Sequence, residues 1–227
     1  MKVSIVSIAK REGDFQNLKK GLKKQSFKDW EFVYSTKRGI PQAWNDAIGK
    51  AKGEIIITTD SDVEIKTNDW IKDMVAAVKK YNKNDPKRRT IIKGIEIHPN
   101  TPWTWCNVGF YADVLKKNNV NEKFPIVEDT ELFSRLRSIG YKGVELPIAP
   151  ILHERRGENS SILKRSFRYG MLNARVNLRY GFVGFKSVKK KSSNIIKREI
   201  VTILSRILYL FGIFVGFISF KIRDYDE

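Results

Sequence analysis

Residues Glu54–Asp62 read EIIITTDSD, and this stretch decides the fold. Its apolar run Ile55–Thr58 is rich in β-favouring residues and follows a Lys-Gly pair, which is typical of a buried central strand in a parallel sheet. Asp60 and Asp62 come where that strand ends. Because ligands of open α/β sheets bind outside the carboxyl ends of the strands, we expect a binding site here.

Two carboxylates held this close together repel each other unless a positive charge lies between them. A divalent cation that carries a nucleoside diphosphate meets this need, since hard cations take oxygen ligands. The competing interpretation is an Asp-rich turn after a strand, because Asp is a common turn residue. The pattern at Asp60-Ser61-Asp62 leaves both interpretations open.

Strands and helices alternate along the first half of the chain, with short loops between them. This alternation predicts a parallel sheet built from βαβ units. The expected strands cover residues 3–8, 31–34, 55–58, 91–97, 103–110 and 144–152, the last of them an edge segment because Pro147 and Pro150 interrupt it. The expected helices cover residues 14–25, a stretch opened by Pro41, 67–81, 111–117 and 130–139.

The composition is that of a globular protein, with 227 residues, 41% of them hydrophobic and one cysteine, Cys106. A single cysteine excludes an intramolecular disulfide framework and a Cys-based zinc site. The sequence opens without a secretory pattern, so we expect a cytoplasmic N-terminus. The net charge of +18 calls for an anionic partner, which at this point is nucleic acid, a membrane surface or a polyanionic substrate.

The last third of the chain differs from the rest. From Ile151 onward it holds 16 basic and 6 acidic residues. Residues 160–180 interleave apolar and basic side chains as in an amphipathic helix, and residues 200–220 carry one charge, Arg206. The uncharged part of that stretch is shorter than the roughly 20 residues that span a bilayer, so we expect an interfacial segment. We predict two domains, residues 1–157 and a helical appendage over 158–227.

A second acidic pair, Glu128-Asp129, stands at the start of a predicted helix, where the helix dipole stabilises a carboxylate. Taken alone, this pair is explained as the acidic charge that is common in the first turn of a helix. Together with Asp60 and Asp62 it predicts a division of labour in which one acidic pair holds a metal and the other supplies a general base.

Other candidate site residues lie nearby in the sequence. His153 follows the last predicted strand and is a candidate metal ligand, and Arg155 and Arg156 after it are candidates for phosphate oxygens. Trp103 and Trp105 are candidates for an acceptor pocket, with core packing as the alternative for at least one of them. No phosphate-binding Gly-x-x-x-x-Gly-Lys-Ser/Thr loop occurs, and no Gly-x-Gly-x-x-Gly follows the first strand.

These motifs together resemble a family-2 glycosyltransferase of the GT-A fold over residues 2–155. VSIVSI at residues 3–8 is similar to the family's first strand, and RGIPQAWNDAIGKAKGEIIITTDSDV to the run that leads into its Asp-x-Asp motif. VEDTELFSRLRSIGYKG is similar to its Glu-Asp helix, and PIAPILH to its closing strand.

The resemblance implies roles for individual residues. Asp129 would be the catalytic base with Glu128 beside it, and Asp62 would bind Mg²⁺ or Mn²⁺ with His153 completing the metal shell. Donor-binding positions would be Ala9, Arg11, Ser35, Asn45, Asp60 and Ser61. The reaction would be inverting, and absence of the processive Gln-x-x-Arg-Trp motif favours transfer of a single sugar.

The sequence departs from the family pattern at two strand ends. The first strand ends in Ala9-Lys10-Arg11, and the second ends in Tyr34-Ser35-Thr36, where the family usually has an Asp that reads uracil. The nucleotide base therefore stays open.

Two other functions remain as alternatives. One is a sugar-phosphate nucleotidyltransferase, although Gly13 stands alone where such an enzyme has a Gly-rich loop. The other is a non-enzymatic, basic protein that binds membranes or nucleic acid. We expect a membrane-attached enzyme on the cytoplasmic face, peripheral or monotopic, that binds no nucleic acid and acts on a glycan or a polyprenyl-phosphate-linked acceptor.

Overall fold

A computed structural model describes residues 2–85, 87, 89–97, 104–153, 162–180 and 207–215. The chain divides into two compact units, Met1–Arg155 and Arg156–Glu227, which are described separately below. The predicted Trp103, Arg155 and Arg156 lie outside the described residues, as does the side chain of His153.

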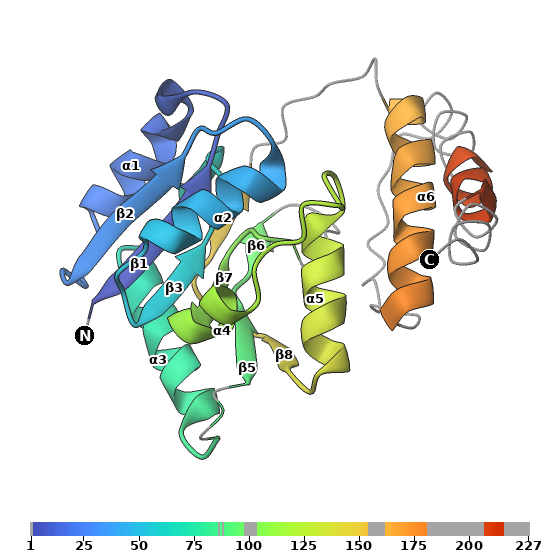
Figure 1. The fold of residues 1–227 in the computed structure, drawn as a ribbon. Coiled ribbons are helices and arrows are strands. Elements are labelled where there is room, and N and C mark those ends of the chain that lie inside the picture. Colours follow the sequence, from blue (N-terminus) through green and yellow to red (C-terminus); the bar gives the residue numbers. More distant parts are fainter. Residues whose placement is uncertain are drawn as a thin grey trace. The chain divides into compact units, whose positions relative to one another are not determined.

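The first unit is built on a six-stranded sheet and a small three-stranded sheet (Figure 1). The large sheet has the order β2-β1-β3-β7-β5-β8, and the small one β4-β9-β6. The strands are β1 (Val3–Ile8), β2 (Trp30–Ser35), β3 (Ile55–Thr58), β4 (Val63–Ile65), β5 (Thr90–Lys93), β6 (Glu96–Ile97), β7 (Val108–Tyr111), β8 (Lys142–Glu145) and β9 (Ile151–His153).

Pairing in the large sheet is mostly parallel, as the strand–helix alternation predicts. β1 pairs in parallel with β2 and β3, and β5 pairs in parallel with β8. β7 runs antiparallel between β3 and β5. The expected α/β class is therefore confirmed, with one reversed strand in the middle of the sheet.

Helices cover both faces of this sheet (Figure 1). They are α1 (Gln16–Lys23), preceded by the 3₁₀ turn η1 (Glu12–Phe15), α2 (Ile40–Lys50), α3 (Trp70–Asn82), α4 (Ala112–Lys117) and α5 (Glu128–Ser138). α3 packs so closely on β7 that a Cβ on Gly109 would lie 2.8 Å from Val78. On the opposite face, Trp44 of α2 stacks on Trp105 at 4.5 Å, and Phe133 of α5 stacks on Phe110 at 6.2 Å.

The central strand predicted from EIIITTDSD is β3, whose residues are all buried. It is covered on both faces, which explains why its apolar run is continuous rather than alternating. A Cβ on Gly53, just before the strand, would lie 2.4 Å from the Ser4 backbone nitrogen, so the chain passes close to β1 there.

The strand expected over residues 91–97 is wrong, because the chain breaks between β5 and β6 and enters the second sheet. The break is made by Asn107, which adopts a φ of 59° and whose backbone oxygen accepts the Gly94 N–H at 2.9 Å. Its side-chain amide donates to Ile95 O and Ala149 O at 3.0 and 2.8 Å. A Cβ on Gly94 would lie 2.6 Å from Asn107 Nδ2, so this crossing requires glycine.

Three other expected boundaries also change. The segment expected over 144–152 is two strands, β8 and β9, which belong to different sheets. The strand expected from residue 103 begins at Val108, because residues 105–107 form a turn. α5 begins at Glu128, two residues before the predicted start, so the acidic pair lies inside its first turn.

The second unit contains α6 (Ile162–Tyr180) and a helix over residues 207–215. The two helices meet at a pair of glycines: a Cβ on Gly170 would lie 2.0 Å from Tyr209 O, and one on Gly212 would lie 2.1 Å from Phe167 O. Asn173 Nδ2 donates to the Tyr209 hydroxyl at 3.3 Å. Within the part of the chain that the structure describes, no helix is long and apolar enough to cross a bilayer.

Candidate active site

The carboxyl ends of β1, β2 and β3 meet at one edge of the large sheet. The Ala9 N–H donates to Ser35 O at 3.2 Å, which joins the end of β1 to the end of β2. The Thr59 N–H donates to Val6 O at 3.1 Å, which places Asp60 beside the same edge. Three predicted donor positions, Ala9, Ser35 and Asp60, therefore lie at the edge where α/β sheets bind ligands.

The small sheet brings His153 next to the Asp-x-Asp motif. β4 and β9 are antiparallel, and their register pairs Val63 with His153. Asp62 is the turn residue directly before Val63, so the backbones of the two predicted metal ligands lie close together although 91 positions separate them in the sequence. Carboxylate oxygens suit Mg²⁺ and Mn²⁺, and imidazole nitrogen is the commonest side-chain metal ligand.

The second acidic pair lies in the first turn of α5. Glu128 is 6% exposed, and Asp129 is half-buried. Asp129 Oδ1 accepts the Thr130 N–H at 2.6 Å and the Thr130 hydroxyl at 3.3 Å. The free N–H groups and the dipole at this helix end favour negative charge, which partly offsets the loss of water around the carboxylates.

The electrostatics connect the two acidic motifs. Burial raises the pKa of Glu128 to about 8, and the negative charges of Asp129 and Asp60 add to the rise. The contribution of Asp60 means that the Asp-x-Asp motif and the Glu-Asp helix face one site. The structure therefore brings together residues that stand 68 positions apart in the sequence.

Asp129 is the stronger acid of the pair. Burial raises its pKa to about 6, while the hydrogen bonds from Thr130 and the positive charge of Lys93 oppose the rise. Asp129 is therefore the group of the pair that ionises more readily, because the hydrogen bonds from Thr130 and the charge of Lys93 favour its carboxylate form. Two neighbouring carboxyl groups whose environments separate their pKa values are the pattern of an acid–base site.

Lys93 acts on Asp129, although no pattern in the sequence indicates a role for it. It is 3% exposed at the end of β5, where its ammonium group pairs with Glu96 and donates to Cys106 O at 3.2 Å. A lysine after an apolar run usually marks the point where a strand reaches solvent. Its burial depends on Glu96, which lies beyond the strand break that the sequence did not predict.

Trp105 lies in the core against the acidic pair, so core packing is part of its role. It is 3% exposed and lies between Trp44 and Phe133, at ring distances of 4.5 and 6.1 Å. Its indole N–H lies beside Glu128 and slightly lowers the pKa of that carboxyl group, yet it reaches hydrogen-bond geometry with no described residue.

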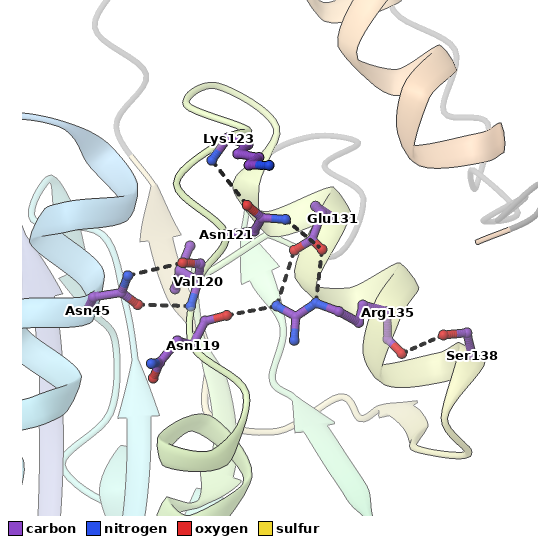
Figure 2. A network of polar contacts seen from close by, with 8 residues as sticks. All are labelled: Asn45, Asn119, Val120, Asn121, Lys123, Glu131, Arg135 and Ser138. Carbon is purple, nitrogen blue, oxygen red and sulfur yellow. Dashed lines mark hydrogen bonds and ion pairs between the residues drawn. The ribbon is translucent and has the colours of Figure 1, made fainter. Parts of the chain in front are cut away.

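Three other predicted donor residues, Arg11, Ser35 and Asn45, have partners within the protein. Arg11 is exposed and lies 3.8 Å from Asp14. The buried Ser35 hydroxyl accepts the Lys37 N–H at 3.2 Å. The side chain of Asn45 hydrogen-bonds to Val120 on the segment before α5 (Figure 2), and also to Glu122. Ser61 is half-buried in the turn between the two aspartates.

A complete metal shell is not present among the described side chains. No three His, Cys, Asp or Glu residues in this part of the chain are grouped so that they would hold a metal ion.

Residues 14–127, half of the chain, match the model of glycosyl transferase family 2. The chain belongs to this family. The match ends just before Glu128-Asp129, so the acidic pair of α5 lies outside the matched residues. Both the family assignment and the acidic site indicate that this family-2 glycosyltransferase is an enzyme that transfers a sugar.

Three solved structures with the same fold are distant from this chain in sequence. The mannosyltransferase PcManGT from Pyrobaculum calidifontis, in complex with GDP-Man and Mn²⁺, has a TM-score of 0.60 and 13% identity, over 99% of this chain and 75% of that one. TarS of S. aureus, residues 1–349, has a TM-score of 0.54 and 17% identity, over 80% of this chain and 67% of that one. Its complex with UDP-GlcNAc has a TM-score of 0.55 and 16% identity, over 80% and 68% of the two chains. No curated protein sequence matches this glycosyltransferase.

Proposed function

We propose that this glycosyltransferase moves a single sugar from a nucleotide-sugar donor to an acceptor hydroxyl, with inversion at the anomeric carbon. The observation that carries the proposal is the convergence of the two acidic motifs, because the charge of Asp60 reaches Glu128. A site of this kind places a donor at the sheet edge opposite a base on α5.

Asp129 acts as the general base in this proposal. It takes the proton of the acceptor hydroxyl while the acceptor oxygen forms its bond to the anomeric carbon. The bond from that carbon to the diphosphate breaks on the opposite face, and the electron pair leaves with the diphosphate. Glu128, protonated near neutral pH, can donate a hydrogen bond to a sugar or acceptor oxygen without competing as a base.

Asp62 and His153 would hold the divalent cation. The pairing of Val63, which follows Asp62, with His153 supports this, as does the local excess of acidic groups around Asp60. When bound, Mn²⁺ or Mg²⁺ supplies positive charge for the leaving diphosphate. Asp60 and Ser61 would contact the donor on the nucleoside side, with Ala9, Arg11 and Ser35 along the same edge.

A screen of donors tests this function. The full chain is incubated with Mn²⁺ and uridine, guanosine or thymidine diphosphate sugars, and released nucleoside diphosphate is measured, with EDTA as the control. We expect one base class to be turned over and EDTA to stop the reaction. Release of pyrophosphate from a nucleoside triphosphate and a sugar 1-phosphate, in a parallel reaction, would instead indicate a nucleotidyltransferase, and no release of nucleoside diphosphate from any donor would refute the proposal.

We further propose that the second unit attaches the enzyme to the cytoplasmic face of a membrane. The helix over residues 207–215 exposes Ile207, Leu210, Phe211 and Phe214, each 55–62% exposed. α6 adds Arg168, Arg175 and Arg179, and each basic residue near an anionic surface contributes about 1 kcal/mol. Two such signals together give stable attachment, which makes a lipid-linked acceptor the leading substrate class. The alternative is an apolar face that packs on a partner subunit.

Flotation with anionic liposomes tests the attachment. The full chain is compared with a Phe211→Ser/Phe214→Ser variant, and Ile139→Ser serves as the control because Ile139 is an equally exposed apolar residue of the first unit, at 55%. We expect the full chain and the control to float and the double variant to stay at the bottom. If the full chain does not float at low salt, the membrane proposal and the lipid-linked acceptor are both wrong.

A further inference from the structure

The segment 118–127 connects α4 to the helix that carries the acidic pair, and hydrogen bonds tie its first half to the helices on both sides (Figure 2). Val120, Phe124 and Val127 anchor it in the core with 3%, 6% and 0% exposure. Its polar side chains and backbone groups contact α2 on one side and α5 on the other. The segment thus lies between the helix that precedes the Asp-x-Asp strand and the helix of Glu128 and Asp129.

Asn45 makes the connection on the α2 side. Its Nδ2 group donates to Val120 O at 3.0 Å, and its Oδ1 atom accepts the Val120 N–H at 2.8 Å. The Nδ2 and Oδ1 atoms therefore bind the C=O and the N–H of one residue, Val120, as the backbone of a neighbouring strand would. The same Nδ2 group lies 3.2 Å from Glu122 Oε1. These three contacts use both N–H donors of Asn45 and one of the two acceptor lone pairs of Oδ1, which leaves little capacity to bind a ligand.

Glu131 and Arg135 make the connection on the α5 side. Arg135 Nε donates to Glu131 Oε1 at 2.9 Å, and Nη2 donates to Glu131 Oε2 at 3.2 Å and to Asn119 O at 2.7 Å. Glu131 is fully buried, two residues after Asp129. The arginine also neutralises a third carboxylate in a helix turn that already holds two.

We propose, on the basis of the glycosyl transfer proposed above, that Asn45 is a positioning residue for the acidic pair rather than a donor-binding residue. It fixes the segment 118–127, and this segment holds the first turn of α5 so that Asp129 and Glu128 face the donor edge. Small displacements matter here, because a shift of about 1 Å in a catalytic group can lower the rate about 100-fold.

The test compares Asn45→Ala with Gln42→Ala in the full chain. Gln42 lies on the same helix and donates to the same Glu122 at 3.2 Å, but among the described residues it forms no hydrogen bond to Val120 or α5, so it is a matched control. Asn45→Asp is the second variant, because it keeps the shape and the acceptor for the Val120 N–H and loses the donor to Val120 O. Circular dichroism shows that each variant is folded.

Three measurements follow: the affinity for GDP and UDP with Mn²⁺, the turnover of GDP-Man and UDP-GlcNAc, and the ¹³C NMR titration of the carboxyl groups without metal. In Asn45→Ala we expect unchanged nucleotide affinity and a turnover number about 10- to 100-fold lower. We also expect the Glu128 titration to move toward its ordinary range, because water reaches the first turn of α5. Asn45→Asp should lie between the wild type and Asn45→Ala, and Gln42→Ala should match the wild type.

The charged groups that act on the pair, Asp60 and Lys93, are unchanged in all of these variants. A loss of nucleotide affinity in Asn45→Ala with an unchanged carboxyl titration would overturn the inference and make Asn45 a donor contact. The titration needs no substrate, so it still decides the role of Asn45 if the wild type proves inactive and the proposed function is wrong.

Discussion

Replacing Arg135 by Met should destabilise the first unit strongly, because the change leaves the Glu131 carboxylate buried without its partner. Glu131 has no exposed surface, and Arg135 forms two hydrogen bonds to it and one to Asn119 O. Removing one member of a buried ion pair costs about 3–5 kcal/mol. Since domains are stable by about 5–15 kcal/mol, Arg135→Met should lose about a fifth of the stability or more.

Urea unfolding followed by tryptophan fluorescence measures this loss. With a slope of about 2–3 kcal/mol/M, the midpoint should fall by about 1–2.5 M. Glu131→Gln/Arg135→Met removes both charges, so it should recover part of the loss. Arg137→Met changes an exposed arginine of the same helix and should stay within about 0.5 kcal/mol of the wild type.

Equal midpoints for Arg135→Met and Arg137→Met would refute the reasoning, because they would mean that the buried pair adds nothing beyond an ordinary surface arginine. A double variant that is less stable than Arg135→Met would also contradict it, since the cost is attributed to the unpaired Glu131 carboxylate.

Three other predictions follow from the same structure. Asp62→Ala should abolish Mn²⁺-dependent binding of a nucleoside diphosphate in calorimetry, and His153→Ala should weaken it less; unchanged metal dependence in Asp62→Ala would remove the metal proposal. The raised pKa of Glu128 means that its protonated form favours folding, so stability falls as pH rises from about 4.5 to about 8. Glu128→Gln without metal should therefore raise the melting temperature at pH 8 and change it little at pH 4, and an equal gain at both pH values would contradict the burial argument. Gly53→Ala should cost about 1–3 kcal/mol because its Cβ would meet the Ser4 backbone at 2.4 Å, whereas Gly49→Ala meets nothing within 4 Å and should be neutral or stabilising in thermal melts; similar melting temperatures would contradict the close approach at Gly53.

The sequence predicts the parts of the fold that depend on local pattern. The run Ile55–Thr58 is apolar throughout because helices cover both faces of β3, and the expected strand is confirmed at those residues. The helix opened by Pro41 is α2, because proline suits the first turn of a helix. The alternation of these elements is enough to predict an α/β sheet.

The sequence does not predict features that depend on distant contacts. The break between β5 and β6 depends on Asn107, which reaches Gly94, Ile95 and Ala149 from a turn in another part of the unit. The antiparallel direction of β7 likewise depends on the path by which the chain returns to the sheet. Neither the break after β5 nor the reversal of β7 produces a periodic pattern in the sequence of the residues involved.

The candidate site likewise contains some residues that the sequence predicts and others that it does not. Asp60, Asp62, Glu128 and Asp129 are recognisable because carboxylates follow a strand or open a helix. Lys93 and the contacts of Asn45 are not, because their roles depend on Glu96, Cys106 and Val120, residues that are close only in the folded chain. For Asn45, family resemblance gave a donor role, and its observed contacts instead support the positioning role proposed above.

The turnover of Asp129→Asn on the donor identified in the screen tests whether Asp129 is the base for sugar transfer. Nucleoside diphosphate affinity with Mn²⁺ is measured beside it, since the substitution removes the base and keeps the side-chain shape. We predict unchanged affinity and a turnover number lower by about 10²–10⁴-fold. A variant with unchanged affinity and turnover within a few-fold of the wild type would contradict the account.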